Sequence, residues 1–255
     1  MSVNINHNNM ILEKKRKNKD TDIIQEAKRK NTKYFIKEGN MIINFENESV
    51  YNGEFKNNLK HGKGKFTWKN GSFYDGEWKD DKFNGHGTFK FLNGNNYIGE
   101  WKDDKFNGKG KQTDITGASY DGEWKDDNRN GYGTIKYSNG NEYIGEWKNN
   151  LKHGKGKFTW KNGYFYDGDW KDDKFHGFGT FKTPNGYEYI GEWKNDKRNG
   201  KGKKTQLNGA FYDGKWKDDQ FHGFGKIKTS NGNEYIGEWE NNKMNGKGKK
   251  TQDRK

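Results

Sequence analysis

Residues 74–96 read YDGEWKDDKFNGHGTFKFLNGNN, and this 23-residue pattern recurs along most of the chain. Each copy begins with Tyr-x-Gly-x-Trp or a close variant and continues with Gly-x-Gly. Eight copies have a further glycine near their end, mostly as Asn-Gly. A fixed period of this length indicates a repeat architecture. Nine copies begin at Tyr51, Tyr74, Tyr97, Tyr120, Tyr143, Tyr166, Tyr189, Tyr212 and Tyr235.

Within one copy, two segments alternate with period two, as β-strands do. The first is residues 74–79, and the second begins at the Gly-x-Gly of residues 85–87. The polar residues 79–84 between them predict a loop, and Asn93-Gly94 supplies the positive φ of a tight reversal. Since no helical segment intervenes, the strands must run antiparallel. The sequence therefore predicts an all-β fold: an elongated, single-layer, open meander of repeated hairpins.

Glycine normally weakens the interior of a strand, so its regular recurrence needs a physical reason. Tyr, Gly and Trp share one face of the first strand, and both glycines of Gly-x-Gly share one face of the second. We expect the rings to lie across the bare glycine backbones. The predicted structural core is Tyr74, Gly76, Trp78, Tyr97, Gly99, Trp101, Tyr120, Gly122, Trp124, Tyr143, Gly145, Trp147, Tyr166, Gly168, Trp170, Tyr189, Gly191 and Trp193.

The composition combines two signals that usually exclude each other. Only 27% of the residues are hydrophobic and 33% are charged, which is typical of disorder, yet the chain has 17 Phe, 14 Tyr and 10 Trp. The absence of cysteine excludes disulfides, cysteine zinc sites and thiol catalysis. No apolar run resembles a secretory signal or a membrane span. We expect a cytoplasmic protein, with a place at the periphery of a membrane or of the cytoskeleton as a further option.

The chain before the repeats is basic. Residues 11–33 carry nine basic and four acidic side chains, and two interpretations stay open: a helix that covers the first sheet edge, or a disordered tail. The predicted organisation is a basic tail over residues 1–27, a degenerate capping repeat over residues 28–50, and the repeat array over residues 51–255.

The motif of residues 74–79, followed by Gly-x-Gly and Asn93-Gly94, resembles a MORN repeat. The resemblance implies a hairpin in each repeat, and a role as a protein scaffold or as a ligand of anionic lipids. Some proteins with MORN repeats also carry a lipid-kinase or methyltransferase domain. Here about 50 residues lie outside the array, too few for such a domain, so we expect neither enzymatic activity nor a cofactor.

Other chemistry finds little support in the sequence. Gly-x-Gly lacks the third glycine and the helix of a dinucleotide loop. His61, His153, His176 and His222 share one repeat position, but neighbouring copies would lie about 10 Å apart, too far to share a metal. Acid pairs such as Asp80-Asp81 lack the closing glutamate of a calcium loop and suggest solvated loop charge. We predict no catalytic and no metal-binding residue.

Residues between the core positions point to the opposite face, which we call the outer face. Its glutamates and lysines suggest either cross-strand pairing or recognition of an anionic partner. The candidate anion-binding residues are Lys63, Lys65, Lys109, Lys111, Lys155, Lys157, Lys201 and Lys203. The candidate partner contacts on the same face are His86, Tyr132, Phe178 and Phe224.

The favoured hypothesis is a scaffold that docks an extended or helical protein segment at a membrane-associated or cytoskeletal site. The alternative is direct binding of phosphoinositide headgroups by the lysines. No nucleic acid is expected, because the aromatic rings are committed to the core. The strand edge at residues 247–252 allows a homodimer. Repeats three, seven and nine carry polar residues where others have Phe and Trp, so the facing groove should be thinner or more open there.

Overall fold

The computed structural model describes residues 38–252, and among these the chain forms strands and turns but no helix. The strands are β1 (Glu38–Asn44), β2 (Val50–Lys56), β3 (Leu59–Thr67), β4 (Phe73–Lys79), β5 (Lys82–Lys90), β6 (Asn96–Lys102), β7 (Lys105–Thr113), β8 (Ser119–Lys125), β9 (Asn128–Lys136), β10 (Glu142–Lys148), β11 (Leu151–Thr159), β12 (Phe165–Lys171), β13 (Lys174–Lys182), β14 (Glu188–Lys194), β15 (Lys197–Thr205), β16 (Phe211–Lys217), β17 (Gln220–Lys228), β18 (Glu234–Glu240) and β19 (Lys243–Thr251).

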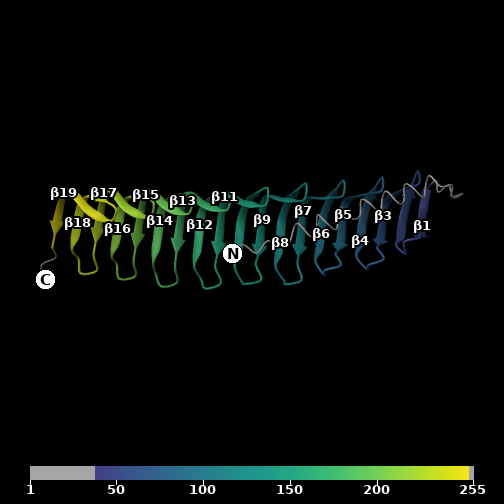
Figure 1. Cartoon of the computed structure of the whole chain (residues 1–255), viewed down its shortest axis with the longest axis horizontal. Coiled ribbons are helices and arrows are strands. Elements are labelled where there is room, and N and C mark those ends of the chain that lie inside the picture. Colours follow the sequence, from purple (N-terminus) through teal and green to yellow (C-terminus); the bar gives the residue numbers. More distant parts are fainter. Residues whose placement is uncertain (1–37, 253–255) are drawn as a thin grey trace. The chain divides into compact units, whose positions relative to one another are not determined.

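The chain divides into an N-terminal half that ends at Ser119 and a C-terminal half that begins at Tyr120. In the N-terminal half, β1 to β7 pair antiparallel in chain order. In the C-terminal half, β9 to β19 do the same. Figure 1 shows these successive hairpins. The predicted fold class, all-β and built of antiparallel hairpins in an open sheet, is confirmed.

The turn inside each repeat is shorter than predicted. Asp80 and Asp81 have φ angles of 50° and 67°, and β5 begins at the next residue. Two successive residues with positive φ define the turn whose twist matches a β-hairpin, and Asp and Asn adopt this conformation at modest cost. The predicted loop over residues 79–84 is therefore wrong. Phe83 belongs to a strand and is buried.

The turn between repeats uses glycine as the sequence suggested. The Gly71 amide donates to the Trp68 carbonyl, and the Trp68 amide donates to the Ser72 carbonyl. Gly71 has a φ of 84°, so the three-residue loop closes on a glycine in the left-handed region. The turn from Phe45 to Ser49 has the same hydrogen bonds, with Glu48 at a φ of 65° in place of glycine.

Eight of the nine repeats show a bulge between their two strands. In repeat two, Gly76 pairs with Gly87 and Trp78 pairs with Phe83, so Glu77 alone faces three residues of β5. The Glu77 carboxylate accepts a hydrogen bond of 3.1 Å from the His86 amide at this bulge. Equivalent bonds join Glu54 to Lys63, Glu100 to Lys109, Glu123 to Tyr132, Glu146 to Lys155 and Glu192 to Lys201. These glutamates therefore stabilise the backbone at the bulge, a role that neither of the two interpretations of the outer face included.

The tyrosine rings lie on glycine backbone, as the sequence suggested. A Cβ atom built on Gly179 would lie 2.5 Å from the Tyr166 hydroxyl, and the hydroxyl itself donates to the Asp169 carbonyl at 2.8 Å. Every tyrosine and tryptophan of the predicted core is buried. The packing is less flat than expected, because Tyr166 meets Trp170 edge-on at 87° and stacks only on Phe175, at 12°.

Besides the backbone pairing of neighbouring strands, two kinds of side-chain hydrogen bond join successive repeats. The Trp170 indole donates to the Gly156 carbonyl of the preceding repeat at 2.8 Å, and other tryptophans repeat this bond. The Asp173 carboxylate, from a hairpin turn, accepts from the Lys152 amide, 21 residues earlier, at 2.9 Å. The second residue of an acid pair therefore links its turn to the backbone of the preceding repeat. The prediction that it is solvated loop charge is wrong.

Candidate docking surfaces

The face that carries the buried rings, here called the inner face, includes a column of residues that the sequence analysis missed. It lies nine residues after each repeat's first tyrosine, at the start of the second strand. Its members are rings, basic side chains and, in the last repeat, a methionine: Lys60, Phe83, Phe106, Arg129, Lys152, Phe175, Arg198, Phe221 and Met244. The sequence did contain a signal for this column: a large side chain recurs at the same position of each repeat, inside an otherwise polar segment.

The basic members of this column are held on aromatic rings. The Arg198 guanidinium lies 4.4 Å from the centre of the Trp216 ring, and its Nε donates to Asp219 at 2.8 Å. Arg129 lies over Trp147 at 4.5 Å in the same way. Cation–π contacts of this kind stabilise a charge that is partly removed from water. The inner face of the C-terminal half is thus both aromatic and cationic.

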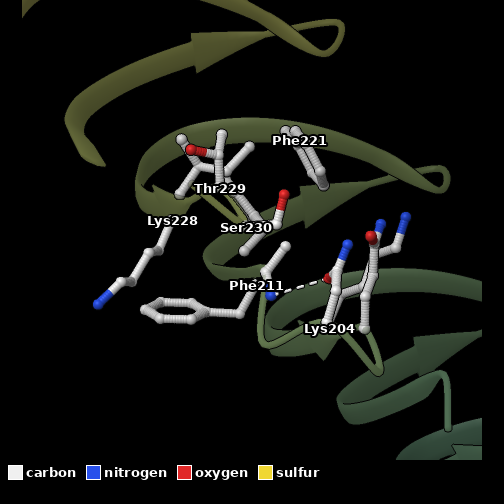
Figure 2. Close-up of a pocket in the computed structure, with 11 residues that line it drawn as sticks. Lys204, Phe211, Phe221, Lys228, Thr229 and Ser230 are labelled. Carbon is white, nitrogen blue, oxygen red and sulfur yellow. Dashed lines mark hydrogen bonds between the residues drawn. The ribbon is translucent and has the colours of Figure 1, made fainter. Parts of the chain in front are cut away.

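The inner face opens at repeat seven. A pocket of about 260 Å³ lies between β15, the turn after it, and β16 and β17 of the next repeat. Figure 2 shows Lys204 on one side of this space, across from Thr229 and Ser230. Phe221 contributes a ring to the lining. A second pocket, lined by Tyr187, Leu207 and their neighbours, adjoins the first and shares Gln206 and Asn208 with it.

Lys204 is the chemically distinctive residue of this pocket. It stands where repeat five has Phe158, and it is half-buried. Burial first, and then the nearby Arg198 guanidinium, lower the pKa of Lys204 below its usual value. Its ammonium group lies 5.4 Å from the Tyr187 ring centre, and no carboxylate among residues 38–252 forms an ion pair with it.

The expectation of a more open face at the polar repeats holds at repeat seven but is wrong at repeat three. Gln112, the counterpart of Lys204, is only 3% exposed. In repeat nine, Lys250 and Gln252 are both exposed. Polar substitution by itself therefore does not determine whether the inner face is open.

The outer face carries the lysines proposed to bind anions, and all eight are exposed: Lys63, Lys65, Lys109, Lys111, Lys155, Lys157, Lys201 and Lys203. Lys155 forms an ion pair with Asp169 at 2.6 Å, and Lys65 lies 3.9 Å from Asp75. Lys157 and Lys203 instead lie over phenylalanine rings of the next strand. In repeats seven and eight, Lys201 stands opposite Lys215, so like charges face each other across the strands.

The four proposed partner contacts, His86, Tyr132, Phe178 and Phe224, are also exposed on the outer face. Each one faces an acidic residue on the next strand: Phe178 is paired with Glu192, and Phe224 with Glu238. Phe178 and Phe224 lie on β13 and β17, four strands apart, or about 19 Å. They form separate apolar spots and not one continuous patch.

Residues 38–252 contain no cluster of three or more side chains that could hold a metal ion. His61 and His153 are half-buried, and each lies near a turn aspartate, at 3.6 Å from Asp80 and 3.5 Å from Asp172. No helix in this part of the chain is long and apolar enough to cross a membrane.

The sequence profile of the MORN repeat matches nine consecutive segments: 51–73, 74–96, 97–119, 120–142, 143–163, 166–186, 189–210, 212–234 and 235–252. The chain belongs to the MORN-repeat family. These segments coincide with the hairpin pairs of both halves. Membership is consistent with a non-enzymatic interaction or scaffold protein.

Other comparisons add little to the MORN assignment. No curated protein matches the chain. Among solved structures, the TCP domain of SAS-4 (dCPAP) of Drosophila melanogaster, in complex with a proline-rich motif of Ana2 (dSTIL), has a TM-score of 0.26 and 11% identity over 84% of this chain and 90% of that one. Virginiamycin B lyase from Staphylococcus aureus has a TM-score of 0.17 and 9% identity over 84% and 83%. These superpositions are too distant to bear on function.

Proposed function

We propose that this MORN-repeat protein is a non-enzymatic scaffold that docks an extended or helical segment of a protein partner on the inner face of its C-terminal half. The partner would be held at a membrane-associated or cytoskeletal site. The open pocket at repeat seven carries the proposal, because the equivalent positions of repeat five are filled by the rings of Phe158 and Trp160.

The chemistry of the pocket defines the partner segment. Its apolar lining, with Phe221 and Ile227, suits an apolar side chain. Lys204 adds a half-buried cation that has no ion pair among residues 38–252. A carboxylate placed here would offset the cost of burying that charge, since buried charges are costly until they are paired. The expected segment therefore carries an acidic residue beside an apolar one.

The test uses the full chain with a photo-crosslinking amino acid at Gln206, a residue that lines both pockets. Crosslinking in the native cell, followed by mass spectrometry, should recover a segment with an acidic residue next to an apolar one. Lys204→Glu should abolish that crosslink. Absence of any crosslinked protein segment, or recovery of basic segments only, would contradict the proposal.

Lys203→Glu provides the matched control. Lys203 is adjacent in sequence but lies exposed on the outer face, over the Phe211 ring. The same change of charge there should leave the crosslink unchanged. Equal loss in both variants would show that overall charge governs binding, and would remove the inner face from the mechanism.

A second candidate function is direct binding of anionic phospholipid by the outer face. The specific observation is the opposition of Lys201 and Lys215, with Lys203 also exposed nearby. Like charges in this arrangement repel, and an anionic headgroup between them relieves the repulsion. Flotation with phosphoinositide vesicles at low and high salt tests it. Binding should fall with salt and with Lys201→Glu, and no binding at low salt would eliminate this function.

A further inference from the structure

The two pockets of the inner face adjoin each other and lie one repeat apart along the sheet. The first is lined by the turn of repeat seven and by β17 of repeat eight, and the second, of about 480 Å³, by the turns of repeats six and seven. One repeat corresponds to two strands, or about 10 Å. A partner segment that fills both pockets must therefore present side chains to the sheet at that spacing.

The second pocket has an apolar rim and an aromatic wall. Leu207 is 82% exposed, and its side chain lies against the preceding turn, where a Cβ atom on Gly186 would come within 2.9 Å of it. The half-buried Tyr187 ring is held in place by the Arg198 guanidinium, which donates to its hydroxyl at 3.0 Å. An apolar side chain of a partner would pack between these two surfaces.

The carboxamide side chains of this pocket keep hydrogen-bond donors for a partner. The Asn208 side-chain oxygen accepts from the Ala210 amide at 3.1 Å, and the Asn185 side-chain oxygen accepts from the Thr183 hydroxyl. These bonds use only the oxygens, so neither NH₂ group forms a hydrogen bond with residues 38–252. Gln206 is exposed where the two pockets meet. Carboxamide NH₂ groups donate to carbonyl oxygens, so this pocket suits a segment with free backbone carbonyls.

One regular backbone conformation meets both the spacing and the donors. In a polyproline II helix, residues i and i+3 point the same way about 9.3 Å apart, and the backbone carbonyls have no internal hydrogen bonds. A β-strand returns to the same face about every 6.6 Å, which does not fit a spacing of about 10 Å. An α-helix fits the spacing with residues i and i+7, about 10.5 Å apart, but its carbonyls are bonded within the helix.

We propose that the docked partner segment is proline-rich and binds across both pockets as a polyproline II helix, an inference that rests on the proposed function. One apolar residue fills the first pocket beside the acidic residue that pairs with Lys204. A proline three positions away packs on Leu207 and Tyr187, and carbonyls between them accept from Gln206 and Asn208. Because proline fixes φ near about −65°, the segment has the bound conformation beforehand, which reduces the entropic cost of docking.

The test compares two fluorescein-labelled peptides of equal length and charge on the full chain, by fluorescence anisotropy. The first probe consists of five Pro-Glu-Pro units. The second is an alanine-based helical peptide with the same number of glutamates and with leucines seven residues apart. The proline-rich probe should bind at least about tenfold more tightly than the helical one, and Lys204→Glu should weaken its binding.

Two variants with matched controls examine the second pocket. Leu207→Ala should weaken binding of the proline-rich probe about fivefold or more, whereas Leu92→Ala, at the same turn position of repeat two, should not change it. Asn208→Asp keeps an oxygen for the Ala210 amide but removes the NH₂ donor, and it should also weaken binding. Asn162→Asp, at the same position of repeat five, should have no effect.

The outcomes separate this inference from the proposed function. Equal or tighter binding of the helical probe, still dependent on Lys204, would overturn the polyproline II assignment and leave the scaffold proposal standing. Binding of the proline-rich probe that is unchanged by Leu207→Ala and Asn208→Asp, or reduced equally by their controls, would overturn it as well. If neither probe binds, this inference fails, and the crosslink at Gln206 still decides the proposed function independently.

Discussion

Each repeat contains two sets of inner-face positions that follow different rules. One set, the tyrosine, its two glycines and the tryptophan, is nearly the same in all nine repeats. The other set lies at the start of the second strand and around its end, and its residue types vary between repeats. The rings Phe158 and Trp160 of repeat five, for example, are replaced by the cation Lys204 and the amide Gln206 in repeat seven. The tyrosines of the first set lie directly on glycine backbone, whereas the residues of the second set contact side chains or solvent.

The difference shows where the fold is determined and where recognition is available. A ring that lies on glycine backbone leaves no room for a Cβ atom, so every repeat must use the same residues there. The residues of the second set determine only whether the inner face is filled by rings or left open as a pocket. We infer that a scaffold of this kind sets its partner preference at these positions without disturbing its hairpins.

We call the first set the constant set and the second the variable set, and the sharpest test of the constant set is Gly145→Ala. The new Cβ would lie 2.5 Å from the Gly156 Cα and 2.6 Å from the Lys155 carbonyl oxygen. Both are backbone atoms that cannot move without breaking the pairing of β10 and β11. We expect a loss of more than about 3 kcal/mol in the free energy of unfolding, measured by denaturant titration.

Gly209→Ala is the matched control. Gly209 has a φ of 78° in a turn, and a Cβ there meets nothing within 4 Å. Only the strain of the left-handed backbone remains, about 1 kcal/mol. Similar losses for the two variants would mean that the tyrosine–glycine contact does not determine the fold.

Alkaline pH should weaken the constant set through its tyrosines. Burial raises the pKa of Tyr212 to about 12, and burial raises the pKa of Tyr74 and Tyr143 further. Between the ordinary tyrosine pKa of about 10 and these values, the unfolded chain loses protons that the folded chain retains. From neutral pH upward, the contribution of the tyrosines to stability should therefore be constant up to about pH 10 and fall above it. Denaturant titrations at several pH values would measure this, and a flat profile up to pH 12 would contradict it.

Substitutions of tryptophan should also distinguish the two sets, with a smaller difference in the free energy of unfolding. Trp170→Phe removes the indole donor from the Gly156 carbonyl and leaves that acceptor without its partner, at a cost of about 1–3 kcal/mol. Trp160→Phe, at a half-buried variable position, should cost less than about 1 kcal/mol. Equal denaturant midpoints for both variants would remove the distinction.

Periodicity was sufficient to predict the hairpins, because each glycine and ring in residues 74–96 has a local reason to be there. The two-residue turn at Asp80-Asp81 was missed, since aspartate is less obvious than glycine as a carrier of positive φ. Phe83, inside that polar run, was the sign that a strand had already begun. The glutamate at the bulge was missed because its acceptor role depends on a register shift that no alternation pattern reveals.

The candidate site was predictable only in part. The departure of Lys204 and Gln206 from the usual rings predicted an opening, and the pocket lies there. The same departure at Gln112 gave no opening, since Gln112 is only 3% exposed. The hydrogen bond from the Lys152 amide to the Asp173 carboxylate joins two successive repeats. It could not be predicted from the sequence pattern of a single repeat.

The smallest expected effect comes from converting repeat seven into a copy of repeat five. Lys204→Phe with Gln206→Trp restores the pair present at Phe158 and Trp160 and fills the pocket with rings. Because the constant set is untouched, stability should rise by about 1 kcal/mol or less, from apolar burial and removal of a half-buried charge. Docking of the acidic segment should nevertheless be lost, since the filled pocket has neither space nor cation. A denaturant titration measures the stability of this variant. Because Gln206 is itself substituted, docking is measured with the photo-crosslinking residue at Asn208 instead. A clear loss of stability would show that repeat seven depends on its polar residues for folding, and the division between the two sets would then fail.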